Sequence, residues 1–377
     1  MKTEILIVGG GVTGLFTARE LLRHGFKDIT VVEKDYFGSG GTFRCATGIR
    51  ASFTSREHVK VMMRAIELWP KWAKELGFTY RRDGYLWLLT RDRDVEMFRH
   101  VVSFHNSLGL NTRLVNPEEV REIVPGINTS KLLGAVYDPL AGKVELFRSI
   151  TNLIRELRDS GVKLLQDTEV RRLVAKNGRI ASAETSRGEI VFDQLVVAAG
   201  TGARKLLVTV GIDLPISNVP KHVLVTETFR PSIKPLIIDW ASSSYLVQLI
   251  HGNFYIGADI PVEADAPARN RYAFLSKAAR VWTHYFPWLR EVYVLRYWTG
   301  YYDMTPDHHP IIGKVDEYEN MVVAAGFSGH GLMMAPAVAE SVVNYLMGRP
   351  QVVEEVRNMA PSRFKEGKLI KEIAVFG

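Results

Sequence analysis

Residues 4–34 read EILIVGGGVTGLFTARELLRHGFKDITVVEK: an apolar run, a glycine-rich turn, an amphipathic segment, a second apolar run and an acid. This order predicts a strand, a turn, a helix and a strand, the arrangement that binds dinucleotides. Gly9 would permit the tight turn, Gly11 would let a pyrophosphate approach the backbone, and Gly14 would let the helix pack close to the strand. The helix N-terminus would face the phosphates, and Glu33 would accept a hydrogen bond from a ribose hydroxyl. We therefore predict that this segment binds an adenine dinucleotide; a purely structural glycine turn is the alternative.

The composition is that of a globular protein with one large or two smaller domains: 377 residues, 46% hydrophobic and 24% charged. No apolar run approaches the ~20 residues of a membrane span and no signal peptide is recognised, so we expect a cytoplasmic protein. The formal net charge of +7 is spread along the chain without a basic tract, which argues against nucleic acid as a partner. This charge suits an anionic cofactor and a carboxylate substrate, and it is also compatible with docking on an anionic membrane surface.

Cys45 is the only cysteine, so the chain has no internal disulfide and no multi-cysteine metal or iron–sulfur site. We predict no metal site. The scarcity of Cys and Gln beside many charged residues is typical of proteins from thermophiles.

Hydrophobic periodicity predicts the remaining elements. Helices are expected over 56–76 with a kink at Pro70, and over 117–125, 148–160, 270–284 and 336–347. Strands are expected over 84–90, up to Val170, over 195–199 and over 321–325, with turns at 177–178 and 187–188. Residues 215–295 form a block that is rich in strands and aromatic residues.

Two further segments of small residues could approach a cofactor. Residues 198–202 (AAGTG) end an apolar strand, although an ordinary turn explains them equally well. Residues 326–331 (GFSGHG) separate a strand from a helix. They are a second place where N–H groups at a helix N-terminus could meet anionic oxygens.

Four motifs in order resemble the flavin-dependent amino-acid oxidase superfamily, the group of sarcosine oxidase and D-amino-acid oxidase. They are GGGVTG (9–14) with Glu33-Lys34, GSGGT (38–42), VVAAG (196–200), and TPDHHPIIG (305–313) followed by AAGFSGHG (324–331). Within the group, GSGGTFRCATGIR and FSGHGLMMAPAV are most similar to the β subunits of archaeal dye-linked L-proline dehydrogenases.

The resemblance covers residues 3–348 and implies an α/β fold (α+β overall). A Rossmann-like FAD-binding domain (1–80, 145–215 and 296–377) is expected to be interrupted by a substrate-binding domain with a mainly antiparallel sheet (81–144 and 216–295). The cofactor implied is FAD. The resemblance places the N-terminal motif on its ADP part, the 38–42 loop near the pyrophosphate or ribityl chain, and the 326–333 segment along the flavin. The implied cofactor-binding residues are Gly9, Gly11, Val12, Gly14, Glu33, Lys34, Ser39, Thr42, Arg44, Cys45, Val170, Ala199, Gly200, Gly300, Gly326, Ser328, Gly329, His330, Gly331, Leu332 and Met333.

The implied chemistry is hydride transfer to flavin N5 from the carbon next to an amine, giving an imine. Such a site must hold the substrate carboxylate, for which an arginine fork is suited. Arg50 is the first choice because it matches the family's arginine within a one-residue gap; Arg44 is second, and a surface or pyrophosphate role is the alternative for Arg50. The catalytic candidates are Arg50, Tyr302, Tyr255 and His330, and the substrate-binding candidates are Arg50, Tyr245, Tyr302 and Met333. For the strand aromatics the alternative is ordinary core packing, and for His330 we favour a contact with the flavin over a general base.

Three departures from the family pattern carry information. Gly300 replaces the cysteine through which one-subunit sarcosine oxidases attach their flavin, so non-covalent FAD is expected. Met333 replaces a carboxylate-binding lysine, which favours a more apolar substrate. Tyr255 replaces a lysine over flavin N5 that assists reaction with oxygen, which favours a dehydrogenase over an oxidase.

The function implied is an FAD-dependent dehydrogenase of a secondary amino acid, best L-proline, that passes electrons to a dye, a quinone or a second flavin. The alternatives are an oxidase or dehydrogenase of sarcosine, glycine or a D-amino acid, and an FAD-carrying electron-relay subunit. The resemblance to a β subunit also implies an oligomer, with a different partner subunit and FMN at the interface as an option.

Overall fold

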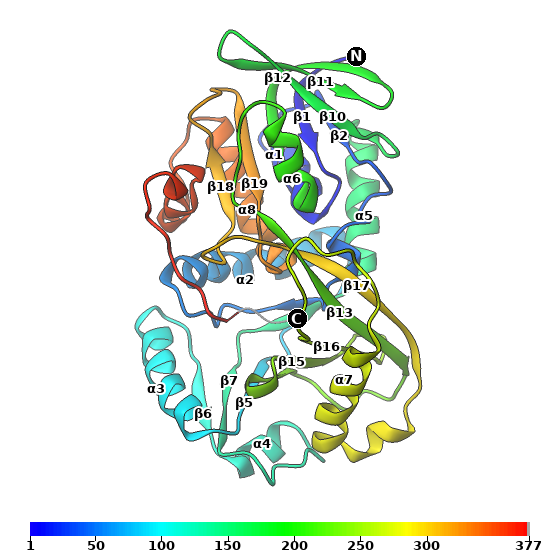
Figure 1. The fold of residues 1–377 in the computed structure, drawn as a ribbon, viewed down its shortest axis with the longest axis vertical. Coiled ribbons are helices and arrows are strands. Elements are labelled where there is room, and N and C mark those ends of the chain that lie inside the picture. Colours follow the sequence, from blue (N-terminus) through cyan, green and yellow to red (C-terminus); the bar gives the residue numbers. More distant parts are fainter. Residues whose placement is uncertain (375–377) are drawn as a thin grey trace.

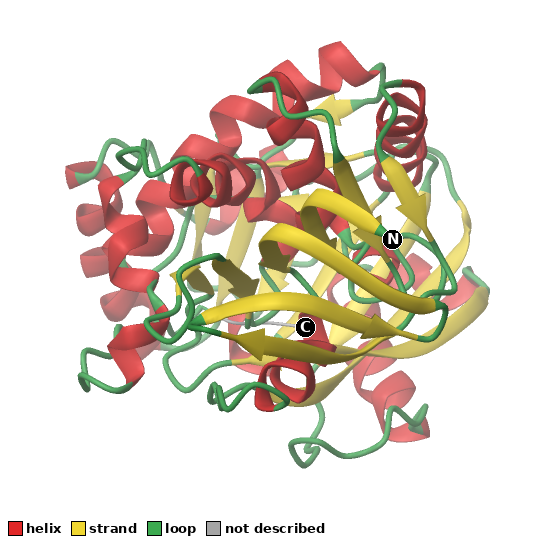
Figure 2. Ribbon diagram, turned by 90° about the horizontal axis from the view of Figure 1, so that it is seen from above, coloured by secondary structure: helices red, strands yellow, loops and turns green. Residues whose placement is uncertain are grey.

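Two eight-stranded sheets organise residues 1–374, the part of the chain that the computed structural model describes (Figure 1). One sheet lies in the upper half of Figure 1 and the other in the lower half, with α2 (Arg56–Leu76) between them. A three-stranded sheet joins β3 (Gly48–Ile49), β8 (Gly142–Val144) and β4 (Tyr80–Arg81). Seen from above, most helices gather to one side of the long central strands (Figure 2).

The first sheet has the order β10-β11-β12-β1-β2-β9, and β19 pairs with both β12 and β18. Strand β1 is parallel to β2 and β12, and β19 is parallel to β12. Alternate residues of β1 enter two cores: Ile5 and Ile7 pack with α1 and α8, whereas Leu6 and Val8 pack with α6. The elements are β1 (Lys2–Val8), α1 (Val12–Arg23), β2 (Ile29–Val32), α5 (Leu146–Asp159), β9 (Lys163–Leu165), β10 (Val170–Lys176), β11 (Arg179–Thr185), β12 (Gly188–Val197), α6 (Ala203–Val208), β18 (Ile311–Lys314), β19 (Met321–Ala325) and α8 (Gly331–Leu346).

The second sheet has the order β17-β13-β16-β15-β14-β5-β7-β6, and every pair except β14–β5 is antiparallel. Strand β5 also divides its side chains: Tyr85 and Trp87 face the core shared with α2, whereas Leu86 and Leu88 face α4 and α7. The predicted fold class is confirmed. The elements are β5 (Tyr85–Leu89), α3 (Asp92–Ser107), β6 (Arg113–Val115), α4 (Pro117–Ile123), β7 (Gly134–Asp138), β13 (Ser217–Thr228), β14 (Leu236–Asp239), β15 (Ser244–Gln248), β16 (Asn253–Ala258), α7 (Tyr272–Tyr285) and β17 (Val294–Met304).

Most predicted helices occur close to their expected limits, and several other elements differ. Strand β12 (Gly188–Val197) starts earlier and ends two residues before the expected 195–199, and β10 begins at Val170, where the expected strand ends. Helix α8 begins at Gly331, five residues before the predicted start at Pro336, so the proline lies within the helix. The sequence pattern suggested a proline at the first helical position, but the glycine turn before α8 ends earlier than that. Helix α3 was not predicted; half of its 16 residues are exposed, and only Asp94, Phe98 and His105 are buried.

No helix within residues 1–374 is long and apolar enough to cross a lipid bilayer.

Strand β17 belongs to the second sheet, where it pairs with β13 along most of its length. The residue limits given above for the two domains stay a prediction.

Candidate functional site

The first glycine turn is closed by two contacts that exclude side chains. Gly9 has φ +113°, and a side-chain carbon there would lie 2.2 Å from the carbonyl oxygen of Ala198. A side-chain carbon at Gly14 would lie 2.0 Å from the carbonyl oxygen of Gly9. Gly9 therefore permits both the turn and the close approach of β12, and Gly14 permits the close packing of α1. These contacts also bring residues 198–200 beside the turn, as the sequence motif suggested.

Few atoms lie against Gly11 at the N-terminus of α1. Its N-cap residue, Gly11, provides no side-chain cap, and the Val12 N–H donates to the hydroxyl of Thr42 at 3.0 Å. A side-chain carbon at Gly11 would contact only that hydroxyl, at 3.3 Å. Side-chain carbons at four nearby loop glycines would meet nothing within 4 Å; these are Gly40, Gly41, Gly200 and Gly202. The space before the helix can thus accept a pyrophosphate, which fits the phosphate end of FAD.

Glu33 links the end of β2 to the turn. Its carboxylate accepts the N–H of Gly10 at 2.8 Å and the N–H of Asp35 at 3.0 Å. Its backbone carbonyl accepts the N–H of Thr168, which brings the start of β10 at Val170 to the same edge of the sheet. Lys34 is exposed beside it. These residues surround the place where the adenosine part of a dinucleotide would lie.

The second glycine turn rests on the end of β17. Gly326, with φ +68°, donates its N–H to the Asp303 carboxylate at 2.8 Å, and the Ser328 N–H donates to the Asp303 carbonyl at 3.0 Å. Burial raises the pKa of Asp303 to about 6. His330 is the N-cap of α8 and gives no side-chain cap, so the first N–H groups of α8 are not capped by that side chain. This helix N-terminus suits the negative end of a reduced flavin.

A small cavity of about 60 Å³ lies between this turn and the second sheet. It brings together five of the six substrate-site and catalytic candidates; Tyr255 is the exception, since it packs on Trp298 with ring centroids 5.3 Å apart. The cavity is lined by Cys45, Ala46, Thr47, Gly48, Arg50, Tyr85, Leu236, Ile238, Tyr245, Tyr302, Gly329, His330, Leu332 and Met333.

Among residues 1–374, Arg50 is the only arginine that lines this cavity, and it is 3% exposed. Its guanidinium donates to the carbonyls of Ser52 and Ala374, both at 2.6 Å, and stacks on the Phe53 ring at 3.7 Å. No carboxylate of residues 1–374 forms an ion pair with Arg50. Burial lowers the pKa of Arg50 to about 10, which leaves it charged at neutral pH. A buried cation whose hydrogen bonds go only to neutral acceptors is suited to bind an anion.

Arg44, the second choice, has a different place. Its guanidinium donates to the carbonyls of Ser39 and Gly40, and a side chain at Gly300 would meet it at 3.2 Å. Arg44 thus supports the 38–42 loop and does not line the cavity. Cys45 does line it, and burial raises the pKa of its thiol to about 11.

Tyr85 was not identified from the sequence. It lines the cavity from β5 and is buried, and a side chain at Gly48 would collide with its hydroxyl. Its only sequence signal is a tyrosine in a strand, which is typical of core residues. Tyr245 and Tyr302 also line the cavity, and burial raises the pKa of all three phenols, so they stay neutral donors.

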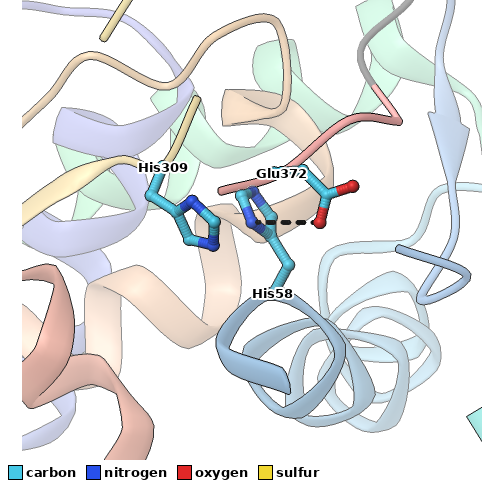
Figure 3. Close-up of side chains that lie close together, drawn as sticks. All are labelled: His58, His309 and Glu372. Carbon is cyan, nitrogen blue, oxygen red and sulfur yellow. Dashed lines mark ion pairs between the residues drawn. The ribbon is translucent and has the colours of Figure 1, made fainter. Parts of the chain in front are cut away.

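Three buried side chains from different parts of the chain lie close together (Figure 3). His58, His309 and Glu372 have ligand-type atoms within 4.8 Å of one another, with the His58 Nδ1 3.8 Å from the Glu372 carboxylate. The hydroxyl of Ser55, however, lies 2.8 Å from His309 Nε2, 2.9 Å from Glu372 and 3.4 Å from His58 Nδ1. Because the hydroxyl occupies the centre of the three groups, a metal ion would have to displace it, and we treat the cluster as hydrogen-bonded rather than metal-binding.

These features define a flavoprotein oxidoreductase, and the chain belongs to the FAD dependent oxidoreductase family, which it matches over residues 4–345. It is similar to the solved structure of L-proline dehydrogenase from P. horikoshii, with 36% identity, a TM-score of 0.93, and 98% of this chain and 99% of that chain covered. It is 27% identical over 387 residues to sarcosine oxidase subunit beta of Rhodobacter capsulatus, covering 100% of this chain and 92% of the relative. Glycine oxidase from Geobacillus kaustophilus shares the fold, with 22% identity, a TM-score of 0.89, and 96% of this chain and 99% of that chain covered. The predicted family resemblance and the predicted enzyme class are confirmed.

Proposed function

We propose that this chain is an FAD-dependent dehydrogenase of a secondary amino acid, with L-proline as the best substrate. The observation that carries the proposal is Arg50: a buried guanidinium that lines the cavity and has no carboxylate partner among residues 1–374. A substrate carboxylate would provide the missing negative charge. The similarity to a solved L-proline dehydrogenase supports proline in particular.

The rest of the cavity suits a ring with one charged end. Met333, Leu332, Leu236 and Ile238 supply apolar walls, while Tyr85, Tyr245 and Tyr302 supply neutral hydroxyls. His330 also lines the cavity, and burial together with the nearby Arg50 lowers its pKa well below the usual value. A neutral His330 adds no second positive charge to the cavity beside Arg50.

FAD, when bound, would accept a hydride from the carbon next to the amine. The residues that would hold it non-covalently are those of the two glycine turns, the 38–42 loop and Glu33. The chain's own part in the reaction is to fix the carboxylate at Arg50, to exclude water with the tyrosines and apolar walls, and so to orient the reacting carbon.

The first test is the visible spectrum of the purified protein before and after anaerobic addition of L-proline. We expect a flavin band near ~450 nm that bleaches on addition. A flavin band that survives L-proline would exclude it as the substrate and direct the test to D-proline and sarcosine. A colourless protein that cannot be loaded with FAD would refute the proposal.

A second candidate is an oxidase or dehydrogenase of sarcosine, glycine or a D-amino acid, which the similarity to a sarcosine oxidase subunit favours. Peroxide formed in each turnover would identify an oxidase. That relative is named as a subunit, so we also propose that this chain works in an oligomer with a different partner chain, and that FMN at their interface is one route for electrons. An inactive isolated chain that carries FAD would favour the electron-relay alternative.

A further inference from the structure

The substrate-site arginine is held in place by the far end of the described chain. Arg50 Nη2 donates to the carbonyl of Ala374 at 2.6 Å, across 324 positions of sequence. Arg50 Nη1 donates to the Ser52 carbonyl, also at 2.6 Å. Two of the five N–H groups of the guanidinium are thereby directed away from a ligand, and the orientation of the remaining three is set.

Glu372 anchors this segment. Its side chain is fully buried, and its carboxylate accepts the N–H groups of Thr54 and Ser55, each at 3.0 Å, and their two hydroxyls at 2.5 and 2.9 Å. Ser55 is the N-cap of α2, so the negative charge lies at the positive end of a 21-residue helix. Glu372 also accepts the N–H of Ala374 at 2.8 Å, which fixes the residue whose carbonyl meets Arg50.

The same segment is bound from its other side. The Glu372 carbonyl accepts from His308 Nδ1 at 2.8 Å, and the Ile373 N–H donates to the Thr54 hydroxyl at 3.2 Å. Residues 372–374 therefore join three places: the loop 50–55, the start of α2, and the segment after β17 that leads from Tyr302. Hydrogen bonds to a fully buried carboxylate are strong and hold their partners in one geometry.

We propose that Glu372 and the carbonyl of Ala374 form a clamp that holds Arg50 in the orientation in which it binds a substrate carboxylate. Glu372 is then a positioning residue, because it acts through Arg50 and does not line the cavity. This inference rests on the proposed function of Arg50 as the carboxylate receptor. It adds a requirement that residues far away in sequence complete the substrate site.

The test uses two unreactive proline analogues and the full-length protein loaded with FAD. Tetrahydrofuran-2-carboxylate carries the carboxylate, and tetrahydrofurfuryl alcohol has the same ring without the charge. Their dissociation constants are measured by titration calorimetry for the wild type, Glu372→Gln, and the matched control Glu366→Gln, whose carboxylate is exposed and pairs with Lys368. We expect Glu372→Gln to weaken carboxylate binding about tenfold to a hundredfold and to leave alcohol binding and FAD content unchanged.

A second variant keeps the result interpretable if Glu372→Gln does not fold. A chain ended after Ile373 with an amidated C-terminus retains Glu372 and removes the carbonyl that Arg50 contacts without adding a carboxylate, and we expect the same selective loss. Equal weakening of the binding of both analogues would mean that Glu372 contributes only to the general stability of the protein, and it would overturn the clamp. If Arg50→Met loses carboxylate binding while Glu372→Gln and the shortened chain do not, the clamp is wrong and the function of Arg50 stands. If Arg50→Met binds the carboxylate normally, the proposed function of Arg50 itself fails.

Discussion

The ring of Tyr302 lies against the backbone of Gly329, so close that a side-chain carbon at residue 329 would be 2.3 Å from the ring. This contact joins the last part of β17 to the glycine turn that begins α8. The cavity wall and the helix N-terminus are therefore one packed unit, and a change in one should move the other.

Substituting Gly329 tests this coupling. Gly329→Ala places a methyl group in the Tyr302 ring and adds strain at φ +87°, so we expect the FAD-loaded protein to lose both flavin affinity and thermal stability. Gly348→Ala is the control, because Gly348 has φ +64° but no neighbouring atom within 4 Å. Flavin content and the unfolding midpoint measure the outcome. Similar losses in both variants would mean that backbone strain alone, and not the Tyr302 contact, explains the effect.

The first turn makes different demands at two glycines. Gly14→Ala would press on the Gly9 carbonyl, so we expect failure to fold or a loss of several kcal/mol of stability. Gly11→Ala meets only the Thr42 hydroxyl at 3.3 Å, so the fold should persist while the added methyl group obstructs the pyrophosphate. Circular dichroism and fluorescence titration with FAD separate the two effects. A Gly11→Ala protein with unchanged FAD affinity would contradict the placement of the pyrophosphate.

Carboxylate binding should weaken at strongly alkaline pH. The pKa of Arg50 is about 10 because burial disfavours its charged form. Below that pH the guanidinium is charged and binds the carboxylate; above it the charge is lost. We expect the dissociation constant of tetrahydrofuran-2-carboxylate to be flat from pH 7 to 9 and to rise by up to tenfold per pH unit above about 10. The uncharged alcohol serves as the control, and an identical rise for it would assign the effect to general alkaline unfolding.

Asp303 should reduce stability as the pH rises. Burial raises its pKa in the folded protein to about 6, above the value of about 4 in an unfolded chain. Between these values the folded protein holds a proton that the unfolded chain has released, so this group's contribution to stability falls by about 2–3 kcal/mol as pH rises from 4 to 6. Asp303→Asn removes the titration but retains an oxygen to accept the Gly326 N–H.

The measurement for Asp303 is the difference in unfolding midpoint between Asp303→Asn and the wild type at several pH values. The unfolding midpoint of the variant should rise relative to that of the wild type as pH rises from 4 to 6, and the difference should then become constant. A difference that does not change with pH would show that Asp303 has the same pKa in both states.

The glycine motifs could be located from the sequence because part of their requirement is local: Gly9 and Gly326 adopt positive φ, and Gly14 packs on the carbonyl of Gly9 five residues earlier. Arg50 could be selected only through the family resemblance. The residues that position it could not be found, because Ala374 meets Arg50, and Glu372 meets the nearby Thr54, only through tertiary packing across more than 300 residues. Tyr85 was also missed because its role depends on tertiary packing. A tyrosine in a strand has the same sequence pattern whether it faces a core or a cavity.

The group through which Ala374 meets Arg50 is a main-chain oxygen, and every amino acid carries one. A mutational scan that exchanges side chains one at a time would therefore leave this contact in place and pass over it. Insertions or deletions near the end of the chain would move the oxygen away from the guanidinium. Libraries that vary chain length are the ones in which this part of the substrate site would become visible.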